Sequence, residues 1–194
     1  NLLQMLLRGG VEPLSERRGN GSPLLIVGGQ AATANPRLWQ RIADAVYLGE
    51  AEEIAAVLCR TLIESKDRSR IDALEALACV PHVYVPRIHG EFGQARLTSH
   101  TLEPIDKVPC HTVILPGDDE FGGSFLLELS RGCKYQCKFC IVHYANGTAR
   151  YREYDSLIEI LDRYRDRYKK VGLLGAAVAD HPRVEDVTEW LVRH

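Results

Sequence analysis

The sequence predicts an α/β protein, and three features of the chain indicate this class. Short apolar runs end in glycine, as residues 23–27 do at Gly28 and Gly29. Segments with apolar residues at helical spacing, such as 51–63, separate these runs. With 45% hydrophobic and 26% charged residues and a net charge of -2, the composition is that of an ordinary globular chain. Strands that alternate with helices favour a parallel sheet covered by helices.

The first half of the chain predicts one such sheet. Continuous apolar runs predict buried strands at 23–27, 44–48 and 82–85. Apolar spacing, capping residues and glycines predict helices at 2–7, 36–42, 51–63 and 71–79, and small residues predict a loop at 30–36. Because ligands of parallel sheets bind beyond the carboxyl ends of the strands, the glycines at those ends, Gly28, Gly29 and Gly49, mark a candidate site.

The second half begins with a change of pattern. From 87 to 124, prolines and turn residues replace the periodic spacing, which predicts a linker between two domains. The predicted elements after it are a strand at 125–129, a charged amphipathic helix at 155–170, a strand at 171–178 and a helix at 184–192. This strand–helix order repeats the opening of a (β/α) barrel. The sequence therefore predicts domains at 1–86 and 125–194.

Three cysteines, Cys133, Cys137 and Cys140, follow the strand at 125–129 with the spacing Cys-x-x-x-Cys-x-x-Cys. Thiolates are the preferred ligands of iron–sulfur clusters, and a four-iron cluster ordinarily takes four of them. Three thiolates would leave one iron open to a small molecule that carries an amine and a carboxylate. A structural zinc site needs a fourth ligand, and His143 or Cys110 would have to supply it away from the usual finger spacing.

The remaining cysteines predict no site of their own. Cys59 and Cys79 lie in helix-like apolar patterns, where a free cysteine is expected to be a small buried hydrophobe. Cys110 follows a proline in a loop and has no evident partner. The uneven spacing of all six cysteines argues against a disulfide framework.

The cysteine spacing, with Phe139 just before the last cysteine, resembles the signature of the radical S-adenosylmethionine (SAM) enzymes. The resemblance implies that Cys133, Cys137 and Cys140 hold a [4Fe-4S] cluster. The open iron of that cluster would bind SAM, which an electron from the cluster splits to a 5′-deoxyadenosyl radical. The resemblance also implies backbone contact with adenine near Phe139 and a reductant such as flavodoxin or ferredoxin. Family members often carry Gly-Gly-Glu, which binds the methionine amino group, where this chain has Gly-Ala-Ala, so only Gly175 carries over.

Residues 25–36 and 44–52 are similar to the second half of the cobalamin-binding domain that precedes the radical SAM domain in one class of these enzymes. The likeness implies a Rossmann-like half-domain at 1–86, followed by the linker and the first two β/α units of a radical SAM (β/α) barrel. It implies contacts to the cobalamin nucleotide tail from Gly28, Gly29, Gln30, Thr33, Gly49 and Glu50. Many sequences of the class have proline in place of Gln30, and the Asp-x-His-x-x-Gly motif of a cobalt-binding histidine is missing.

Together these resemblances predict part of a cobalamin-dependent radical SAM enzyme that acts on an unknown substrate, with methyl transfer as the commonest outcome in the class. One alternative is a radical methylthiotransferase acting on tRNA or a ribosomal protein, because residues 140–142, Gly147 and residues 150–152 are similar to that family. Another is a non-catalytic module that binds zinc or cobalamin. Only about two β/α units fit after the cysteines. The chain is therefore expected to be an internal fragment, inactive alone, and no catalytic side chain is predicted.

Charge and hydropathy add further expectations. The near-neutral net charge gives no electrostatic footprint for nucleic acid, and no apolar run is long enough for a membrane helix. No secretory signal is recognisable at the start of the chain, so we expect a cytoplasmic protein. Arg150 and Arg152 either meet the carboxylate of SAM or serve packing and solvation.

Overall fold

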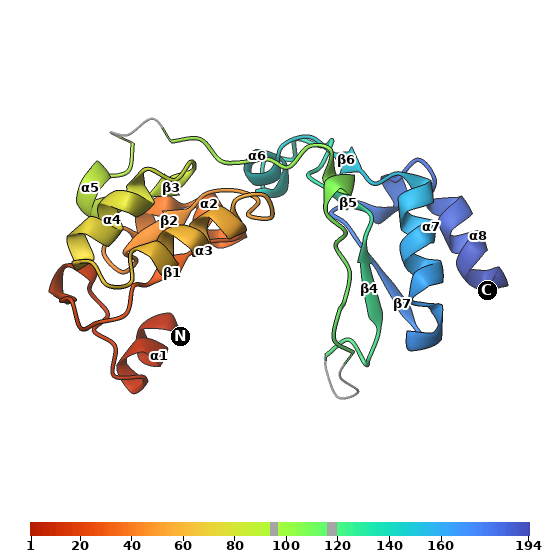
Figure 1. The fold of residues 1–194 in the computed structure, drawn as a ribbon. Helices are drawn as coiled ribbons and strands as arrows, with labels where there is room; N and C mark the ends of the chain where they lie inside the picture. Colours follow the sequence, from red (N-terminus) through yellow and green to blue (C-terminus); the bar gives the residue numbers. More distant parts are fainter. Residues whose placement is uncertain (94–96, 116–119) are drawn as a thin grey trace. The chain divides into compact units, whose positions relative to one another are not determined.

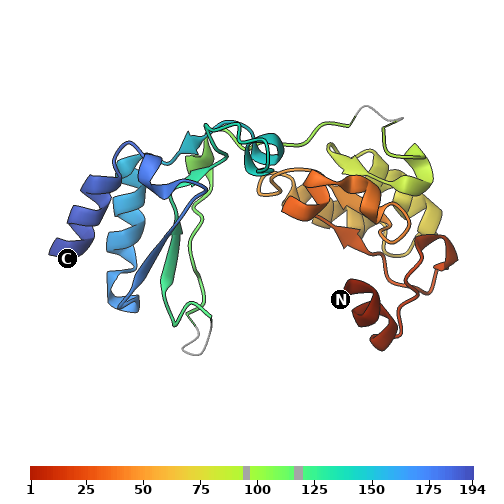
Figure 2. The same cartoon turned by 180° about the vertical axis from the view of Figure 1, so that it is seen from behind.

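The computed structural model describes residues 1–93, 97–115 and 120–194. It divides into two compact units, Asn1–Leu102 and Glu103–His194 (Figure 1, and from behind in Figure 2). The segment predicted as a linker contributes to both, with residues 87–102 in the first unit and 103–124 in the second. Residues 94–96 and 116–119 of that segment lie outside the described residues.

The first unit is built on a three-stranded sheet with the order β1-β2-β3. β1 (Ile26–Val27) and β2 (Ala45–Tyr47) run parallel as predicted, but β3 (Val83–Tyr84) runs antiparallel to β2, so the prediction of an all-parallel sheet is wrong. Two helices, α3 (Ala55–Glu64) and α4 (Arg70–Ala78), lie between β2 and β3. The chain is therefore back at the carboxyl end of β2 when β3 begins. There the Leu48 N–H donates to the His82 carbonyl (2.9 Å).

Short helices complete the first unit. The first five residues of the loop predicted at 30–36 instead form α2 (Gln30–Ala34), which begins after Gly29. Gly29 has a φ of 87°, which glycine adopts without steric cost, and its carbonyl accepts from the Thr33 N–H (3.0 Å). The short helices of this unit are α1 (Leu2–Arg8), η1 (Ser15–Arg17), α2 (Gln30–Ala34), η2 (Pro36–Trp39) and α5 (Pro86–His89).

The central strand β2 is buried on both faces. Successive side chains of a strand point to opposite sides, so each face of β2 packs against a different set of residues. Ala45 and Tyr47 pack against α3 and α4, which lie in front of the sheet in Figure 1. Val46 and Leu48 pack on the other face with Ala32 of α2, which faces the viewer in Figure 2. This burial on two sides confirms the interpretation of the apolar run 44–48 as a fully covered strand.

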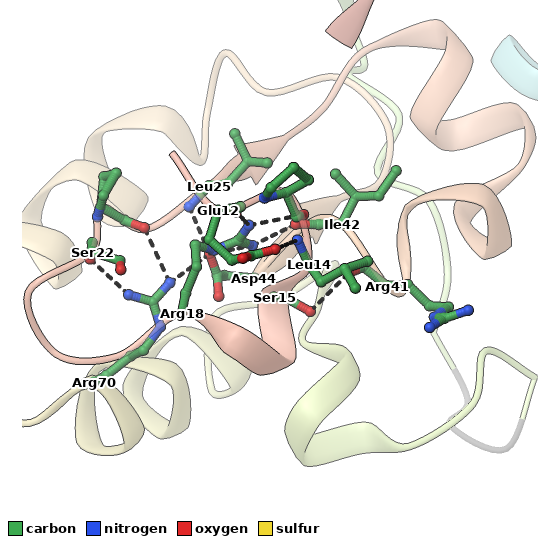
Figure 3. Close-up of polar contacts among 12 residues, drawn as sticks. Glu12, Leu14, Ser15, Arg18, Ser22, Leu25, Arg41, Ile42, Asp44 and Arg70 are labelled. Atoms are coloured by element: carbon green, nitrogen blue, oxygen red, sulfur yellow. Dashed lines mark hydrogen bonds and ion pairs between the residues drawn. The ribbon is translucent and has the colours of Figure 1, made fainter. Parts of the chain in front are cut away.

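A buried ion-pair network links three segments of the first unit (Figure 3). Asp44, just before β2, is 3% exposed, and its Oδ2 lies 2.9 Å from Arg18 Nη2 and 2.8 Å from Arg70 Nη2. The Leu25 N–H donates to the same oxygen (2.8 Å). Both guanidinium groups also donate to backbone carbonyls, those of Glu12, Pro13, Ile42, Gly19, Ser22 and Pro23. The carboxylate therefore fixes the segment before β1, the start of β2 and the start of α4 against one another.

The second unit has a parallel strand pair, β4 (Phe125–Glu128) and β7 (Val171–Leu174), joined through α7 (Tyr154–Arg163). Alternate residues of β4 face a core formed with α7 and α8 (Val184–Arg193). The core side chains with the least exposure are Phe125, Leu127, Leu129, Leu157, Leu161 and Val187. The predicted order of strand, helix, strand and helix is confirmed here, in one β/α/β unit followed by a helix.

Two predicted boundaries of this unit are wrong. The helix predicted for 155–170 ends at Arg163, and the short turn η4 (Arg165–Arg167) follows it. The strand predicted for 171–178 ends at Leu174, and the chain turns into η5 (Val178–Asp180). The other elements are η3 (Ile105–Lys107), the antiparallel pair β5 (Ser130–Arg131) and β6 (Arg150–Tyr151), and α6 (Val142–Asn146).

Residues 110–112, from the predicted linker, run antiparallel along β4 on the edge that β7 leaves free. The Thr112 N–H donates to the Leu126 carbonyl (2.9 Å), and the Glu128 N–H donates to the Cys110 carbonyl (3.1 Å). These bonds make the segment part of the second unit.

Two cysteines are placed differently from the prediction. Cys59 on α3 and Cys79 at the end of α4 are exposed, so the prediction that they are buried is wrong. Leu58 and Leu62 make the core contacts of α3, and Cys59 follows Leu58 by one residue, which turns it about 100° away around the helix. Within the described ranges, no helix is both long and apolar enough to cross a bilayer.

Candidate metal centre

The loop that carries the three predicted ligands lies between β5 and α6, and its base is closed by glycine. Gly132 has a φ of 71°, and a Cβ there would lie 2.2 Å from the Thr148 carbonyl oxygen. Only glycine permits this approach of two backbones. The Cys133 N–H donates to the carbonyl of Gly147, the residue after α6 (3.2 Å), which holds the start of the loop against the end of that helix. The cysteine loop, residues 133–140, therefore starts from a fixed point.

Inside the cysteine loop the contacts are local. The Cys140 N–H donates to the Cys137 carbonyl (3.0 Å), and the His143 Nδ1 lies 2.7 Å from the Cys133 carbonyl oxygen. All three thiols are free, with Cys133 and Cys140 half-buried and Cys137 exposed. Phe139 is 94% exposed, so its side chain contributes nothing to the core.

The donor set of this loop fits an iron–sulfur cluster by its chemistry, because three free thiols from one short segment are the ligands that such clusters take. In the described part of the chain, no three His, Cys, Asp or Glu side chains are already grouped as ligands around a metal position. Cys110, weighed as a fourth zinc ligand, lies beside β4. Burial raises the pKa of its thiol, and the Glu128 carboxylate raises it further, which disfavours the thiolate that a metal needs.

The carboxyl ends of β4 and β7 meet the start of the cysteine loop. The Leu129 N–H donates to the Leu174 carbonyl (2.8 Å). A Cβ on Gly175 would lie 2.5 Å from Ser130 Oγ, so the predicted site residue Gly175 sits directly against β5. Beyond it, Asp180 of η5 pairs with Lys134 (Nζ to Oδ1, 3.1 Å) and accepts from the Tyr135 hydroxyl (3.4 Å). The sequence alone gives no indication of these contacts between Asp180 and the loop.

The two arginines after the loop differ in their partners. Arg152 is 2% exposed and donates to Glu128 (2.9 Å) and to the carbonyls of Ile105 (2.6 Å) and Val108 (2.9 Å), so the packing interpretation is confirmed for it. Arg150 donates to the Asn146 carbonyl (2.9 Å). Glu128 also holds Arg131 through both carboxylate oxygens (2.9 and 3.0 Å). A partly buried charge network therefore supports the strand from which the loop departs.

The second predicted site lies in the first unit, at the carboxyl ends of β1 and β2. Gly28 and Gly29 line an apolar cavity of about 210 Å³ together with Tyr47, Leu58 and Cys59. Gln30 is exposed at the start of α2. This corner of the unit offers an apolar wall but no charged group among the lining residues.

The other predicted contacts of this site bind the chain itself. The Thr33 hydroxyl accepts from the Gly49 N–H (2.9 Å), and a Cβ on Gly49 would lie 2.1 Å from the His100 carbonyl oxygen. Glu50 accepts from the Leu102 N–H through Oε2 (2.8 Å), and its carbonyl lies 2.7 Å from His100 Nδ1. Since His100–Leu102 occupies the approach to Gly49 and Glu50, these residues as folded do not fit a cobalamin nucleotide tail.

Tyr47 lies beside this corner and provides a pH-dependent signal. Its hydroxyl donates to the Glu50 carbonyl (2.8 Å). Burial, together with the nearby carboxylate of Glu52, raises the pKa of the phenol from 10.0 to about 12. Because the pKa of Tyr47 is higher in the folded than in the unfolded protein, its protonated phenol contributes to the free energy of unfolding below pH 10. This contribution is lost as the pH rises through about 12.

We therefore expect the free energy of unfolding of the first unit to fall as the pH rises from about 10 to 12, and to fall less in Tyr47→Phe. Urea unfolding followed by Trp39 fluorescence, in a Trp190→Phe background, measures this at a series of pH values. Equal pH dependence in the two proteins would show that burial of Tyr47 does not oppose its ionisation.

Comparison with known proteins gives matches over parts of the chain. Residues 1–86 match the family described as "Radical SAM proteins, N-terminal". An uncharacterized protein of Methanocaldococcus jannaschii is 30% identical over 73 residues, which is 37% of this chain and 16% of that protein. A CDK5RAP1-like protein of Caenorhabditis elegans is 36% identical over 61 residues, covering 31% of this chain and 11% of the relative.

A CDK5RAP1-like protein of Oryza sativa subsp. japonica is 26% identical over 121 residues, covering 61% of this chain and 20% of the relative. The matched stretches thus span only 11% to 20% of the length of these three curated relatives. The family match concerns the N-terminal part of radical SAM proteins and covers residues 1–86 of this chain.

Proposed function

We propose that this chain is part of a radical SAM enzyme, and that Cys133, Cys137 and Cys140 bind its [4Fe-4S] cluster. The observation that carries the proposal is a loop with three free thiols at the carboxyl ends of the parallel strands β4 and β7. Ligands of parallel sheets bind at such ends. The family match covers residues 1–86 and so does not include the cysteines, which makes it an independent support.

A cluster held by these three cysteines would supply the electron for the reductive cleavage of SAM. The chain's own residues would hold and orient the ligands. Gly132 sets the start of the cysteine loop, and the Glu128–Arg152 pair braces the strand beneath it. Gly175 allows the end of β7 to lie directly against Ser130, and the backbone near the exposed Phe139 would contact the adenine group. The proposed electron donor is a cytoplasmic flavodoxin or ferredoxin.

Cobalamin and cobalamin-dependent methyl transfer are not part of this proposal, because His100–Leu102 fills the approach to Gly49 and Glu50. The methylthiotransferase alternative needs three more thiolates for a second cluster. Cys59 and Cys79 are exposed on separate helices of the first unit, and Cys110 belongs to the second unit, where it lies beside β4. The number of clusters per chain separates a radical SAM enzyme with one cluster from a methylthiotransferase with two.

Iron analysis tests the proposal. After anaerobic reconstitution, the full-length protein is expected to hold about four irons per chain, the content of one four-iron cluster. Cys133→Ala, Cys137→Ala and Cys140→Ala should each lose most of this iron, whereas the control variants Cys59→Ala and Cys79→Ala should keep it. About eight irons would favour the methylthiotransferase. Zinc in place of iron, or iron retained when all three loop cysteines are replaced, would overturn the proposal.

A further inference from the structure

We propose that Asp180 is a positioning residue that holds the cysteine loop against the carboxyl end of β7 through Lys134 and Tyr135. The inference rests on the proposed function, because it assigns Asp180 a task in presenting the thiols to a cluster. We call the contacts of Asp180 with Lys134 and Tyr135 the Asp180 clasp.

The clasp holds the part of the loop next to its first thiol. Lys134 and Tyr135 directly follow Cys133, and both reach the same oxygen, Oδ1 of Asp180, at 3.1 and 3.4 Å. The Lys134 Nζ also lies 5.1 Å from the centre of the Tyr135 ring, so the two donors support each other. The clasp therefore connects the cysteine loop to a residue that lies 45 positions after Tyr135 in the sequence.

The backbone on both sides of Asp180 is held by hydrogen bonds. The next residue, His181, is 3% exposed. Its Nε2 lies 2.9 Å from the Arg152 carbonyl oxygen, and its Nδ1 accepts from the Arg183 N–H (3.1 Å). The Asp180 N–H donates to the Ala177 carbonyl (3.0 Å). Since the backbone on both sides of Asp180 is fixed, its carboxylate is a fixed anchor for the exposed loop.

The carboxylate of Asp180 is also oriented. Its Oδ2 is shielded from solvent and has no hydrogen-bond partner in the described part of the chain, whereas Oδ1 receives both loop donors. With Oδ2 shielded, Oδ1 is the oxygen of Asp180 that is available to donors from the loop. The two oxygens thus have separate surroundings, and only one of them is used by the clasp.

The loop has few other attachments. Cys133 is held by its backbone, through Gly147 and His143, and the next described contact that leaves the loop is the clasp. A site works only when its ligands are held within about 0.5 Å of their productive positions. Lys134 is half exposed, and exposed ion pairs add little to global stability. The clasp should therefore matter for the geometry of the thiols and not for the stability of the fold.

Two variants remove the clasp and one preserves it. Asp180→Asn keeps the shape and removes the charge, Lys134→Met removes the cation, and Lys134→Arg keeps it. Asp186→Asn is the matched control, because Asp186 of α8 pairs with Arg183, the residue before that helix, and has no described contact with the loop. Tyr135→Phe removes only the weaker contact.

Measurements on metal-free protein test the clasp without a cluster. The rate at which iodoacetamide alkylates Cys133, read by peptide mass spectrometry, should rise severalfold in Asp180→Asn and Lys134→Met. It should stay near the wild-type rate in Lys134→Arg and Asp186→Asn, with the same thermal midpoint in all of them. Equal rates in Asp180→Asn and wild type would overturn the inference. A lowered thermal midpoint in both Asp180→Asn and Tyr135→Phe would also overturn it, because it would show a structural role.

The second measurement uses the reconstituted full-length protein. Groups that orient metal ligands typically contribute about 10- to 100-fold in metal affinity, so iron loss to a chelator should be about 10-fold faster in Asp180→Asn than in Asp186→Asn. Equal loss would contradict the inference. If the wild type takes up no iron, the proposed function fails. The alkylation rates then decide separately whether Asp180 positions the loop.

Discussion

Replacing Asp44 with leucine is expected to lower the free energy of unfolding of the unit Asn1–Leu102 by about 3 to 5 kcal/mol, because two buried guanidinium groups lose the carboxylate between them. Arg18 and Arg70 are 2% and 6% exposed, so water cannot replace the missing charge. Urea unfolding of a Trp190→Phe protein, followed through Trp39 fluorescence, reports on this unit alone. Trp39 packs with the Ala32 side of the sheet.

Two control variants show that burial is the cause. Asp44→Asn keeps the shape and one acceptor, so its loss of stability should be smaller than that of Asp44→Leu. Glu16→Gln removes the exposed pair of Glu16 with Arg41 (3.9 Å) and should change stability by less than about 1 kcal/mol. An Asp44→Leu protein as stable as Glu16→Gln would mean that the network in Figure 3 contributes nothing to the fold.

Gly132→Ala is expected to destabilise the unit Glu103–His194 and to abolish cluster binding. The new Cβ would lie 2.2 Å from the Thr148 carbonyl oxygen and 2.7 Å from that of Gly147, both of them backbone atoms. Left-handed strain at a non-glycine residue costs about 1 to 3 kcal/mol. Forcing the two backbones apart adds about 1 to 3 kcal/mol more. Trp190 fluorescence in a Trp39→Phe background measures the loss, and iron content after reconstitution measures the effect on the site.

Gly147→Ala is the matched control for this prediction. Gly147 has a φ of 75°, close to that of Gly132, but a Cβ there would meet no atom within 4 Å. It should therefore show the strain of about 1 to 3 kcal/mol without the clash. If the two variants are equally stable and bind equal amounts of iron, the close approach at the base of the loop has no role in the site.

The strands of the first unit could be predicted from the sequence because their signal is local. The apolar run at 44–48 indicated burial on both faces, and Ala45 and Val46 are both fully buried. The predicted direction of β3 was wrong, although the two helices before it were predicted. Two consecutive helices return the chain to the end of the sheet from which it left, and this feature of the pattern could have revealed the antiparallel strand.

Interactions between distant positions could not be predicted in this way. Asp44 lies inside an apolar run, and its partner Arg18 is 26 positions away in sequence, so no local pattern connects them. The cysteines of the candidate site were found because all three belong to one short loop with a recognisable spacing. The contacts of Asp180 with Lys134 and Tyr135 could not be predicted, because they depend on how η5 packs next to the loop.

Electron paramagnetic resonance of the reconstituted and reduced full-length protein tests the central claim most directly. The claim is that three thiolates, those of Cys133, Cys137 and Cys140, leave one iron of the cluster open to SAM. The account predicts a reduced [4Fe-4S] signal whose g-values change when SAM is added. A signal that is the same with and without SAM would contradict it.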